Sequence, residues 1–310
     1  MKHISYIFQN LEVDTLIRVE RLTKTYRSGK GIFDIDFDVS EGEVFGYLGP
    51  NGAGKTTTIR QLMGFTNADH GRCTIRGLDT RREAKDIQRH VGYVPGEIAF
   101  LEDMTGLGFL TLLSQMRGMK RAPRMDELVD RFELEVGERI RRMSKGMKQK
   151  VAIIAGFMHD PTVYILDEPT SGLDPLMQTT FIELILEEKR RGKTILMSSH
   201  NFAEIDRTCH RAAIIREGRL AVVEDIAKLK QAQRKVFVVS VAADADLTVL
   251  RDSGLELGSI TNHQVEVVIG ADYDQFAAAL ARCSVVGLDM VPQSLEDVFM
   301  HYYGKGGDPA

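Results

Sequence analysis

The chain has 310 residues, 43% of them hydrophobic and 27% charged, with a formal net charge of -4. This length suits two domains, or one domain with a large insertion, and the slightly acidic balance argues against bulk nucleic-acid binding, which usually needs a basic stripe. No run reaches the roughly 20 apolar residues that span a bilayer, and a signal-peptide pattern is lacking, so we expect a cytoplasmic protein.

The first two thirds of the chain predict an α/β core. Residues 1–16 form an N-terminal extension before the first clear strand. Three dense apolar runs then follow, at residues 43–48, 163–167 and 194–199. Such runs are typical of strands that are buried on both faces of a parallel sheet. Because residues 97–150 are mostly helical and charge-rich in pattern, we expect a mixed, largely parallel sheet over residues 17–232 with an inserted helical subdomain.

The last third of the chain predicts a separate small domain over residues 233–305, after a polar helical link. Its apolar patterns predict strands at 236–241, 255–260, 265–269 and 285–290, and helices at 244–253, 273–281 and 294–303. The order β-α-β-β-α-β, before the last helix, is that of a ferredoxin-like α+β unit. This domain either aids dimerisation or regulation, or only adds stability.

The stretch "GPNGAGKTT" fits the phosphate-loop pattern G-x-x-x-x-G-K-[ST] and joins a strand to a helix, which is the context that the pattern requires. Its glycines let backbone N–H groups point at phosphate oxygens, and the helix N-terminus adds partial positive charge. Lys55 would reach the β- and γ-phosphates, and the Thr56 hydroxyl would bind Mg²⁺. We therefore expect a P-loop NTPase core in which nine consecutive residues form the phosphate cradle: Gly49, Pro50, Asn51, Gly52, Ala53, Gly54, Lys55, Thr56 and Thr57.

Two other apolar strands end in residues that suit nucleotide hydrolysis. In "VYILDE" the strand delivers Asp167 to the carboxyl edge of the sheet, where its carboxylate can hold Mg²⁺. Glu168 follows directly; it is either part of a solvated turn or the base that orients and deprotonates the attacking water. "LMSSH" brings His200 to the same edge, where the imidazole either forms a structural hydrogen bond or contacts the γ-phosphate.

Two further features suggest contacts with a nucleotide. Tyr26, in "LTKTYRSG", is either an aromatic residue on the sheet surface or a platform on which an adenine ring stacks. The stretch "RRMSKGMKQKVAIIAG" reads as a helix start prepared for an anion, with Ser144 as N-cap, Gly146 for close approach and several lysines. It is either a second, incomplete phosphate site or simply a capped basic helix.

In this order, the motifs between about Ile17 and Lys230 resemble those of the ATP-binding cassette (ABC) ATPase family. The resemblance implies an adenine-stacking role for Tyr26 and a switch-histidine role for His200. "GPNGAGKTT" matches the Walker A loop, "VYILDE" the Walker B strand, "SGLD" the D-loop with Asp174, and "MSKGM" the signature motif. In that family two cassettes pair head to tail, and Ser144 and Gly146 of one chain would contact the ATP that the other chain holds.

The sequence departs from the family pattern at two places. The signature has Lys145 in place of the first glycine and Met147 in place of glutamine. The glutamine of the family's Q-loop would fall at Gly96, which has no side chain for Mg²⁺ or water. Either Glu97 takes its place or that contact is missing.

The resemblance implies an ATPase (ATP and water to ADP and phosphate) that requires ATP and Mg²⁺. Its partners would be a second copy of the chain, as a homodimer, and an integral membrane permease, with no nucleic acid. The motifs and the small C-terminal domain look most like the branch that exports drugs, antibiotics, lipids or polysaccharide, peripheral on the cytoplasmic face of the membrane. The alternative is a non-transport ABC ATPase that acts on a ribosome or a nucleic-acid complex.

Overall fold

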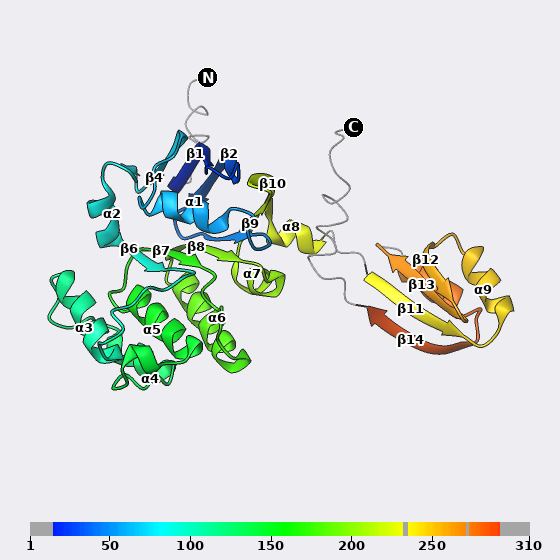
Figure 1. Cartoon of the computed structure of the whole chain (residues 1–310). Coiled ribbons are helices and arrows are strands. Elements are labelled where there is room, and N and C mark those ends of the chain that lie inside the picture. The colour runs from blue at the N-terminus through cyan, green and yellow to red at the C-terminus, as the bar shows by residue number, and fades with distance from the viewer. Residues whose placement is uncertain (1–14, 232–234, 271–272, 292–310) are drawn as a thin grey trace, which may run out of the picture. The chain divides into compact units, whose positions relative to one another are not determined.

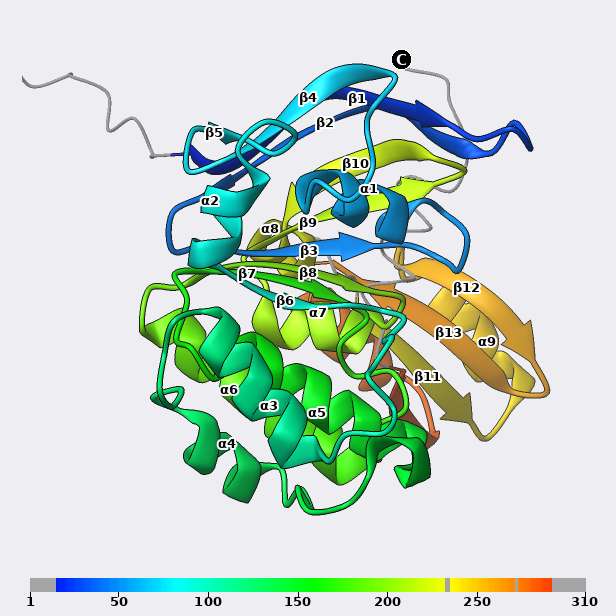
Figure 2. The same cartoon turned by 60° about the vertical axis from the view of Figure 1, so that its left-hand side comes forward.

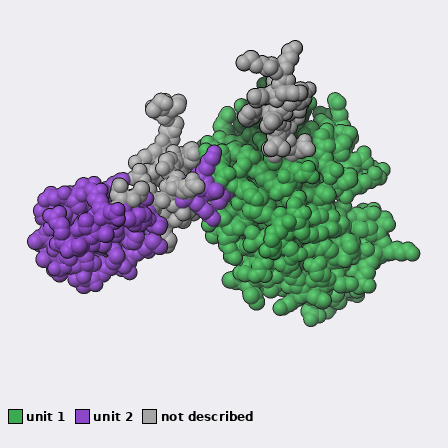
Figure 3. Space-filling view, turned by 180° about the vertical axis from the view of Figure 1, so that it is seen from behind, with its two compact units in different colours: residues 1–225 green, residues 226–310 purple. Residues whose placement is uncertain are grey.

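The computed structural model describes residues 15–231, 235–270 and 273–291. The chain divides between Asp225 and Ile226 into two compact units (Figure 3). No helix of the described residues has the length and apolar character needed to cross a membrane.

The first unit contains an antiparallel sheet with the strand order β2-β1-β4-β5. Its strands are β1 (Thr15–Thr25), β2 (Gly31–Ser40), β4 (His70–Ile75) and β5 (Leu78–Asp79). Alternate residues of β1 and β2, among them Ile17, Val19 and Phe37, are buried, as expected for a sheet with one face on a core. β1 ends just before Tyr26.

A six-stranded sheet with the order β10-β9-β3-β8-β7-β6 forms the centre of this unit. Its strands are β3 (Val44–Leu48), β6 (Val91–Val94), β7 (Val163–Asp167), β8 (Thr194–Ser199), β9 (Arg211–Arg216) and β10 (Arg219–Asp225). All neighbouring pairs are parallel except β9 with β10, so the expected mixed, largely parallel sheet is confirmed. Every residue of β3, β7 and β8 is buried, as the apolar runs predict.

Figure 2 shows α1 between the two sheets and a group of helices, α3 to α6, on the opposite side of the six-stranded sheet. The helices of this unit are α1 (Lys55–Leu62), α2 (Ala84–His90), α3 (Gly106–Met116), α4 (Met125–Arg131), α5 (Lys145–Phe157), α6 (Pro175–Arg190) and α7 (Phe202–Thr208), with a 3₁₀ turn at Ile140–Arg142. Residues 97–150 contain only helices, turns and one isolated bridge between Thr105 and Arg139, in line with an inserted helical subdomain.

The second unit begins with α8 (Ile226–Gln231) and contains an antiparallel sheet with the order β12-β13-β11-β14 (Figure 1). Its other elements are β11 (Lys235–Val241), α9 (Asp244–Arg251), β12 (Glu256–Thr261), β13 (Gln264–Ile269), α10 (Tyr273–Leu280) and β14 (Val285–Val291). Leu250 and Phe276 of the helices pack with Val239 and Val267 of the sheet. The order β-α-β-β-α-β is that of the expected ferredoxin-like unit, and the helix expected at 294–303 lies outside the described residues.

Candidate nucleotide-binding site

The predicted phosphate cradle is the loop that joins β3 to α1. Gly54 caps α1 with φ at 113°, a left-handed conformation that L side chains rarely adopt. A Cβ at this position would also lie only 2.6 Å from Cγ2 of Ile32. The backbone of the loop can therefore take its tight path into the helix only with glycine here, as the motif implies.

This loop lines a cleft next to the bend that follows β1. The lining residues are Tyr26, Lys30, Gly31, Asn51, Gly52, Gly54, Lys55, Thr56, Thr57 and Glu168. Tyr26, a residue that is 38% exposed, thus lies at the same cleft as the phosphate loop, although the two are not neighbours in sequence. The structure therefore brings Tyr26 and Glu168 to the same cleft as the phosphate loop.

Lys55 is held by the loop itself. Its Nζ donates hydrogen bonds to the carbonyl oxygens of Gly49 (2.5 Å) and Pro50 (3.1 Å), and the residue is only 4% exposed. The backbone of the cradle therefore fixes the ammonium group at the cleft, where it is available to a phosphate. Ala53, which is also buried, accepts a hydrogen bond at its carbonyl oxygen from the Gly218 amide.

Lys55, Glu168 and His200 form a chain of contacts. One carboxylate oxygen of Glu168, Oε1, lies 3.1 Å from Lys55 Nζ, and the other, Oε2, lies 3.2 Å from Nδ1 of His200. The φ angle of Glu168 is +47°, a strained conformation for a residue with a side chain; such strain is common at active sites. The structure therefore places Glu168 between the phosphate-loop lysine and the histidine that follows β8.

Asp167 is fully buried beside the cleft, and Oδ1 of its carboxylate accepts a hydrogen bond of 2.6 Å from Ser198 Oγ. Burial raises the pKa of Asp167, and the hydrogen bond from Ser198 and the nearby Thr56 hydroxyl oppose this shift. Oδ2 is buried and has no hydrogen-bond partner among the described residues. A buried carboxylate oxygen without a partner, next to a threonine hydroxyl, fits the oxygen ligands that Mg²⁺ prefers.

The predicted signature residues lie elsewhere. Ser144 caps α5, because its Oγ accepts a hydrogen bond of 3.2 Å from the Met147 amide. A Cβ on Gly146 would lie 2.9 Å from the carbonyl oxygen of Gly172, so glycine is needed for this close approach to the D-loop. Neither Ser144 nor Gly146 lines the cleft at the phosphate loop.

Two charged residues near the signature also lie away from that cleft. Lys145, which replaces a glycine of the family pattern, extends over the D-loop of its own chain and donates a hydrogen bond of 3.2 Å from Nζ to Ser171 Oγ. Asp174, predicted from the resemblance to help bind the nucleotide, caps α6 by accepting a hydrogen bond of 3.0 Å from the Met177 amide. Within one chain, Lys145 therefore holds the D-loop and Asp174 caps the helix that follows it.

The Q-loop position is occupied by a residue without a side chain. Gly96 lies directly beside Asp167, and a Cβ there would come within 3.0 Å of Asp167 Oδ2. The side chain of Glu97 is 90% exposed, with its carboxylate 3.8 Å from the guanidinium of Arg60. In this structure Glu97 therefore faces solvent and does not take the place of the family's glutamine.

Several buried polar residues connect the loops of the site and were not predicted from the sequence. Glu204 accepts hydrogen bonds from Ser199 (2.9 Å) and Thr170 (2.7 Å), and so connects the segments after β7 and β8. Gln149 of α5 donates a hydrogen bond of 2.7 Å to the Pro169 carbonyl oxygen. The two serines that end β8, Ser198 and Ser199, could have been noticed in the sequence, because two hydroxyl residues at the end of the otherwise apolar run "TILMSS" indicate polar contacts there.

Comparisons with known proteins agree with this geometry. Residues 32–171 match the family model described as ABC transporter. The bacitracin transport ATP-binding protein BcrA of Bacillus licheniformis is 30% identical over 95% of this chain and 99% of its own length. The Nod factor export ATP-binding protein I of Paraburkholderia xenovorans is 32% identical over 94% of this chain and 98% of its own length.

A solved structure points to the same family. The structure titled "Structure of ATP binding subunit of ABC transporter" superposes with a TM-score of 0.65 at 32% identity, covering 70% of this chain and 92% of that one. A dimeric cassette bound to ADP and phosphate, MJ0796, has a TM-score of 0.60 at 22% identity and supports the fold alone. The chain therefore belongs to the family of ABC transporter ATP-binding subunits, and it is an ATPase.

Proposed function

We propose that this chain is the motor subunit of an exporter, in which two copies pair around two ATP molecules and drive a separate integral membrane permease. The contacts among Lys55, Glu168 and His200 carry this proposal, because they gather a phosphate-binding lysine, a carboxylate and an imidazole at one cleft. The full-length relatives are named for transport of bacitracin and export of Nod factor, which favours an exporter over a ribosome- or nucleic-acid-associated ATPase.

The separation of two anion-binding features within one chain supports the pairing of two chains. Tyr26 and the phosphate loop share one cleft, whereas the capped N-terminus of α5 with Ser144 and Gly146 does not reach that cleft. A helix N-terminus of this kind suits an anion, and in a head-to-tail homodimer it would meet the γ-phosphate held by the partner. Closure would then depend on a contact that exists only while the γ-phosphate is present.

Within each site the residues have distinct roles. Lys55 would bind the β- and γ-phosphates, and Tyr26 would stack on the adenine. Thr56 and Asp167 would hold Mg²⁺, which when bound neutralises charge on the phosphate oxygens. Glu168 would orient and deprotonate the attacking water, and His200, which contacts Glu168 in the present structure, would stabilise the γ-phosphate.

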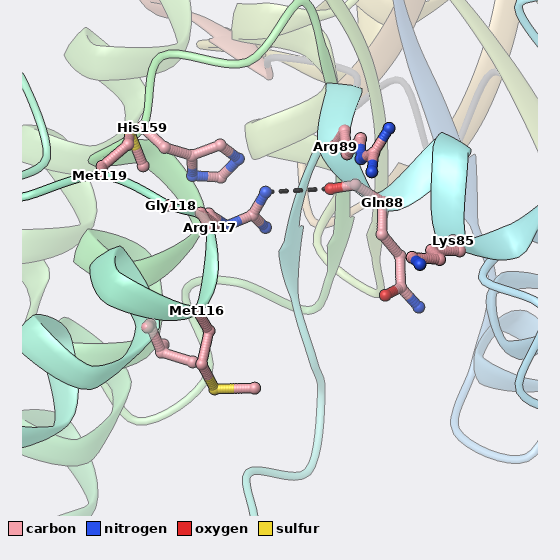
Figure 4. A pocket seen from close by; sticks show the side chains of 9 residues that line it. Lys85, Gln88, Arg89, Met116, Arg117, Gly118, Met119 and His159 are labelled. Carbon is pink, nitrogen blue, oxygen red and sulfur yellow. Dashed lines mark hydrogen bonds between the residues drawn. The ribbon is translucent and has the colours of Figure 1, made fainter.

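A second cleft supports a docking surface for the permease. It lies where α2, the end of α3 and His159 meet (Figure 4), and its lining residues are Lys85, Gln88, Arg89, Leu113, Met116, Arg117, Gly118, Met119 and His159. Arg117 spans it, with a hydrogen bond of 2.9 Å from Nη1 to the Gln88 carbonyl oxygen. A cleft lined by both apolar side chains (Leu113, Met116 and Met119) and basic ones (Lys85, Arg89 and Arg117) suits a cytoplasmic segment of the permease that carries acidic residues. Such docking would keep the chain at the cytoplasmic face of the membrane.

The test is to express the chain together with candidate multi-span permeases from the same genome and to measure both phosphate release and resistance of the cells to a panel of peptide antibiotics. We expect Mg²⁺-dependent ATP hydrolysis in the purified complex and increased resistance that disappears in the Lys55→Ala variant. Hydrolysis without any resistance or transported compound, and without association with a membrane protein, would refute the exporter while leaving the ATPase intact.

A further inference from the structure

We propose that Ser198 is a positioning residue that sets the orientation of the Asp167 carboxylate and supports the backbone of Glu168. This inference rests on the proposed function, because it concerns the same Mg²⁺–ATP site. Ser198 lies near the end of β8, and its side chain is fully buried. Among the described residues its side chain has no hydrogen bond to the phosphate loop or to His200, so its influence on the site is exerted through Asp167 and Glu168.

The strand register places Ser198 beside Asp167. β7 and β8 are parallel neighbours, and Asp167 is paired with Ser198. The hydroxyl donates its single proton to Asp167 Oδ1 over 2.6 Å, a length typical of a strong hydrogen bond to an ionised acceptor. Because this bond fixes one carboxylate oxygen, the other, Oδ2, is left as the oxygen without a partner among the described residues. Ser198 thereby leaves Oδ2 as the oxygen that would be available to Mg²⁺.

The same hydroxyl also supports Glu168. Ser198 Oγ accepts a hydrogen bond of 3.0 Å from the Glu168 amide, which in addition lies 3.2 Å from the Ser198 carbonyl oxygen. Glu168 has a φ of +47°, and such a conformation persists only when the surrounding structure holds it. Without the hydroxyl, the Glu168 amide would keep only the Ser198 carbonyl oxygen of these two acceptors. The position of Glu168 would then become less well defined.

The neighbouring serine does not duplicate this role. Ser199 Oγ donates to Glu204 Oε2 over 2.9 Å and accepts a hydrogen bond from the Asn201 amide. Its hydroxyl is thus bonded to Asn201, which follows β8, and to Glu204 of α7. Of the two serines, only Ser198 has hydrogen bonds to both acidic residues at the end of β7.

The experiment compares nucleotide affinity with and without Mg²⁺ in the full chain, using a fluorescent ATP analogue. For Ser198→Ala we expect affinity for the Mg²⁺ complex to fall about tenfold, equal to about 1.4 kcal/mol, while affinity measured in EDTA stays at the wild-type value. Hydrolysis should fall as well. Ser198→Cys, nearly isosteric but a weaker donor, should give an intermediate loss and provides a second variant if alanine impairs folding.

The matched control is Thr194→Val. Thr194 lies at the opposite end of β8, is 1% exposed, and its hydroxyl accepts a hydrogen bond of 2.8 Å from the Gly42 amide. Its loss should lower thermal stability about as much as the loss of Ser198, without changing the effect of Mg²⁺ on affinity. A Ser198→Ala protein with the wild-type effect of Mg²⁺, or a Thr194→Val protein with the same reduction, would overturn the inference. A wild-type chain whose ATP binding ignores Mg²⁺ would refute the proposed metal site instead.

Discussion

Replacing Glu168 by glutamine should change ATP binding and ATP hydrolysis in opposite directions. The carboxylate now lies 3.1 Å from the ammonium of Lys55, which is 4% exposed, while the side chain of Glu168 is 22% exposed. At an effective dielectric constant of about 20, two unit charges at this distance attract each other by about 5 kcal/mol before desolvation. A γ-phosphate that binds Lys55 must compete with this carboxylate.

Glutamine removes the competing charge and the base together. If desolvation cancels about three-quarters of the attraction, about 1.4 kcal/mol remains, which corresponds to about tenfold tighter ATP binding. Without a base to activate water, hydrolysis should slow by about 10²–10⁴-fold. The bound γ-phosphate would then persist, and an ATP-bound dimer should accumulate.

The assay combines three measurements: the Kd of a fluorescent ATP analogue, the rate of phosphate release, and the elution volume in gel filtration with ATP. His200→Ala is the matched control, because it removes the other contact of Glu168 and keeps the pair with Lys55. It should slow hydrolysis without tightening ATP binding. A Glu168→Gln chain that binds ATP more weakly, hydrolyses it at the wild-type rate, or stays monomeric would refute this reasoning.

Three further predictions concern other parts of the first unit. Gly146→Ala should abolish the ATP-dependent dimer in gel filtration, because the added Cβ would lie 2.9 Å from the Gly172 carbonyl oxygen and displace this part of the signature. The ATP affinity of the single chain should stay the same. A normal dimer would contradict the proposed contact across the interface. Gly96→Gln should leave ATP affinity in EDTA unchanged but weaken binding of the Mg²⁺ complex, since its Cβ would lie 3.0 Å from Asp167 Oδ2; a large loss in EDTA would show that this loop has another role. Burial lowers the pKa of His159 from 6.5 to about 4. As the pH falls, this histidine is therefore protonated in the unfolded chain before it is protonated in the folded one. The free energy of unfolding should fall by up to about 3 kcal/mol between pH 6.5 and pH 4. Denaturant titrations of the wild type and of His159→Gln should differ in this pH slope, and equal slopes would contradict the prediction.

The sequence predicted those parts of the site that depend on neighbours along the chain. The phosphate loop could be read from "GPNGAGKTT" because glycine, lysine and threonine act there through the backbone of one strand-loop-helix unit. The buried strands could likewise be recognised, because a strand covered on both faces must be apolar along its whole length. Asp167 and Glu168 could be placed at the sheet edge because they directly follow such a strand.

Which of these side chains lie in contact depends on how the strands assemble. The contact of Glu168 with both Lys55 and His200 requires β3, β7 and β8 to lie side by side with their carboxyl ends together, and no local pattern sets that order. The direction of Lys145, over its own D-loop, could not be read from the residue type, because a long flexible side chain follows whatever acceptor the fold brings near.

The chemistry at each strand end can therefore be read from the sequence, since residue type and chain neighbours are enough to specify a phosphate cradle or a carboxylate at a sheet edge. Which strand ends lie side by side depends on the assembled sheet, as in the pairing of Asp167 at the end of β7 with Ser198 of β8. The physical reason is that the register of parallel strands is fixed by packing of the whole buried sheet, to which residues far apart in sequence contribute together.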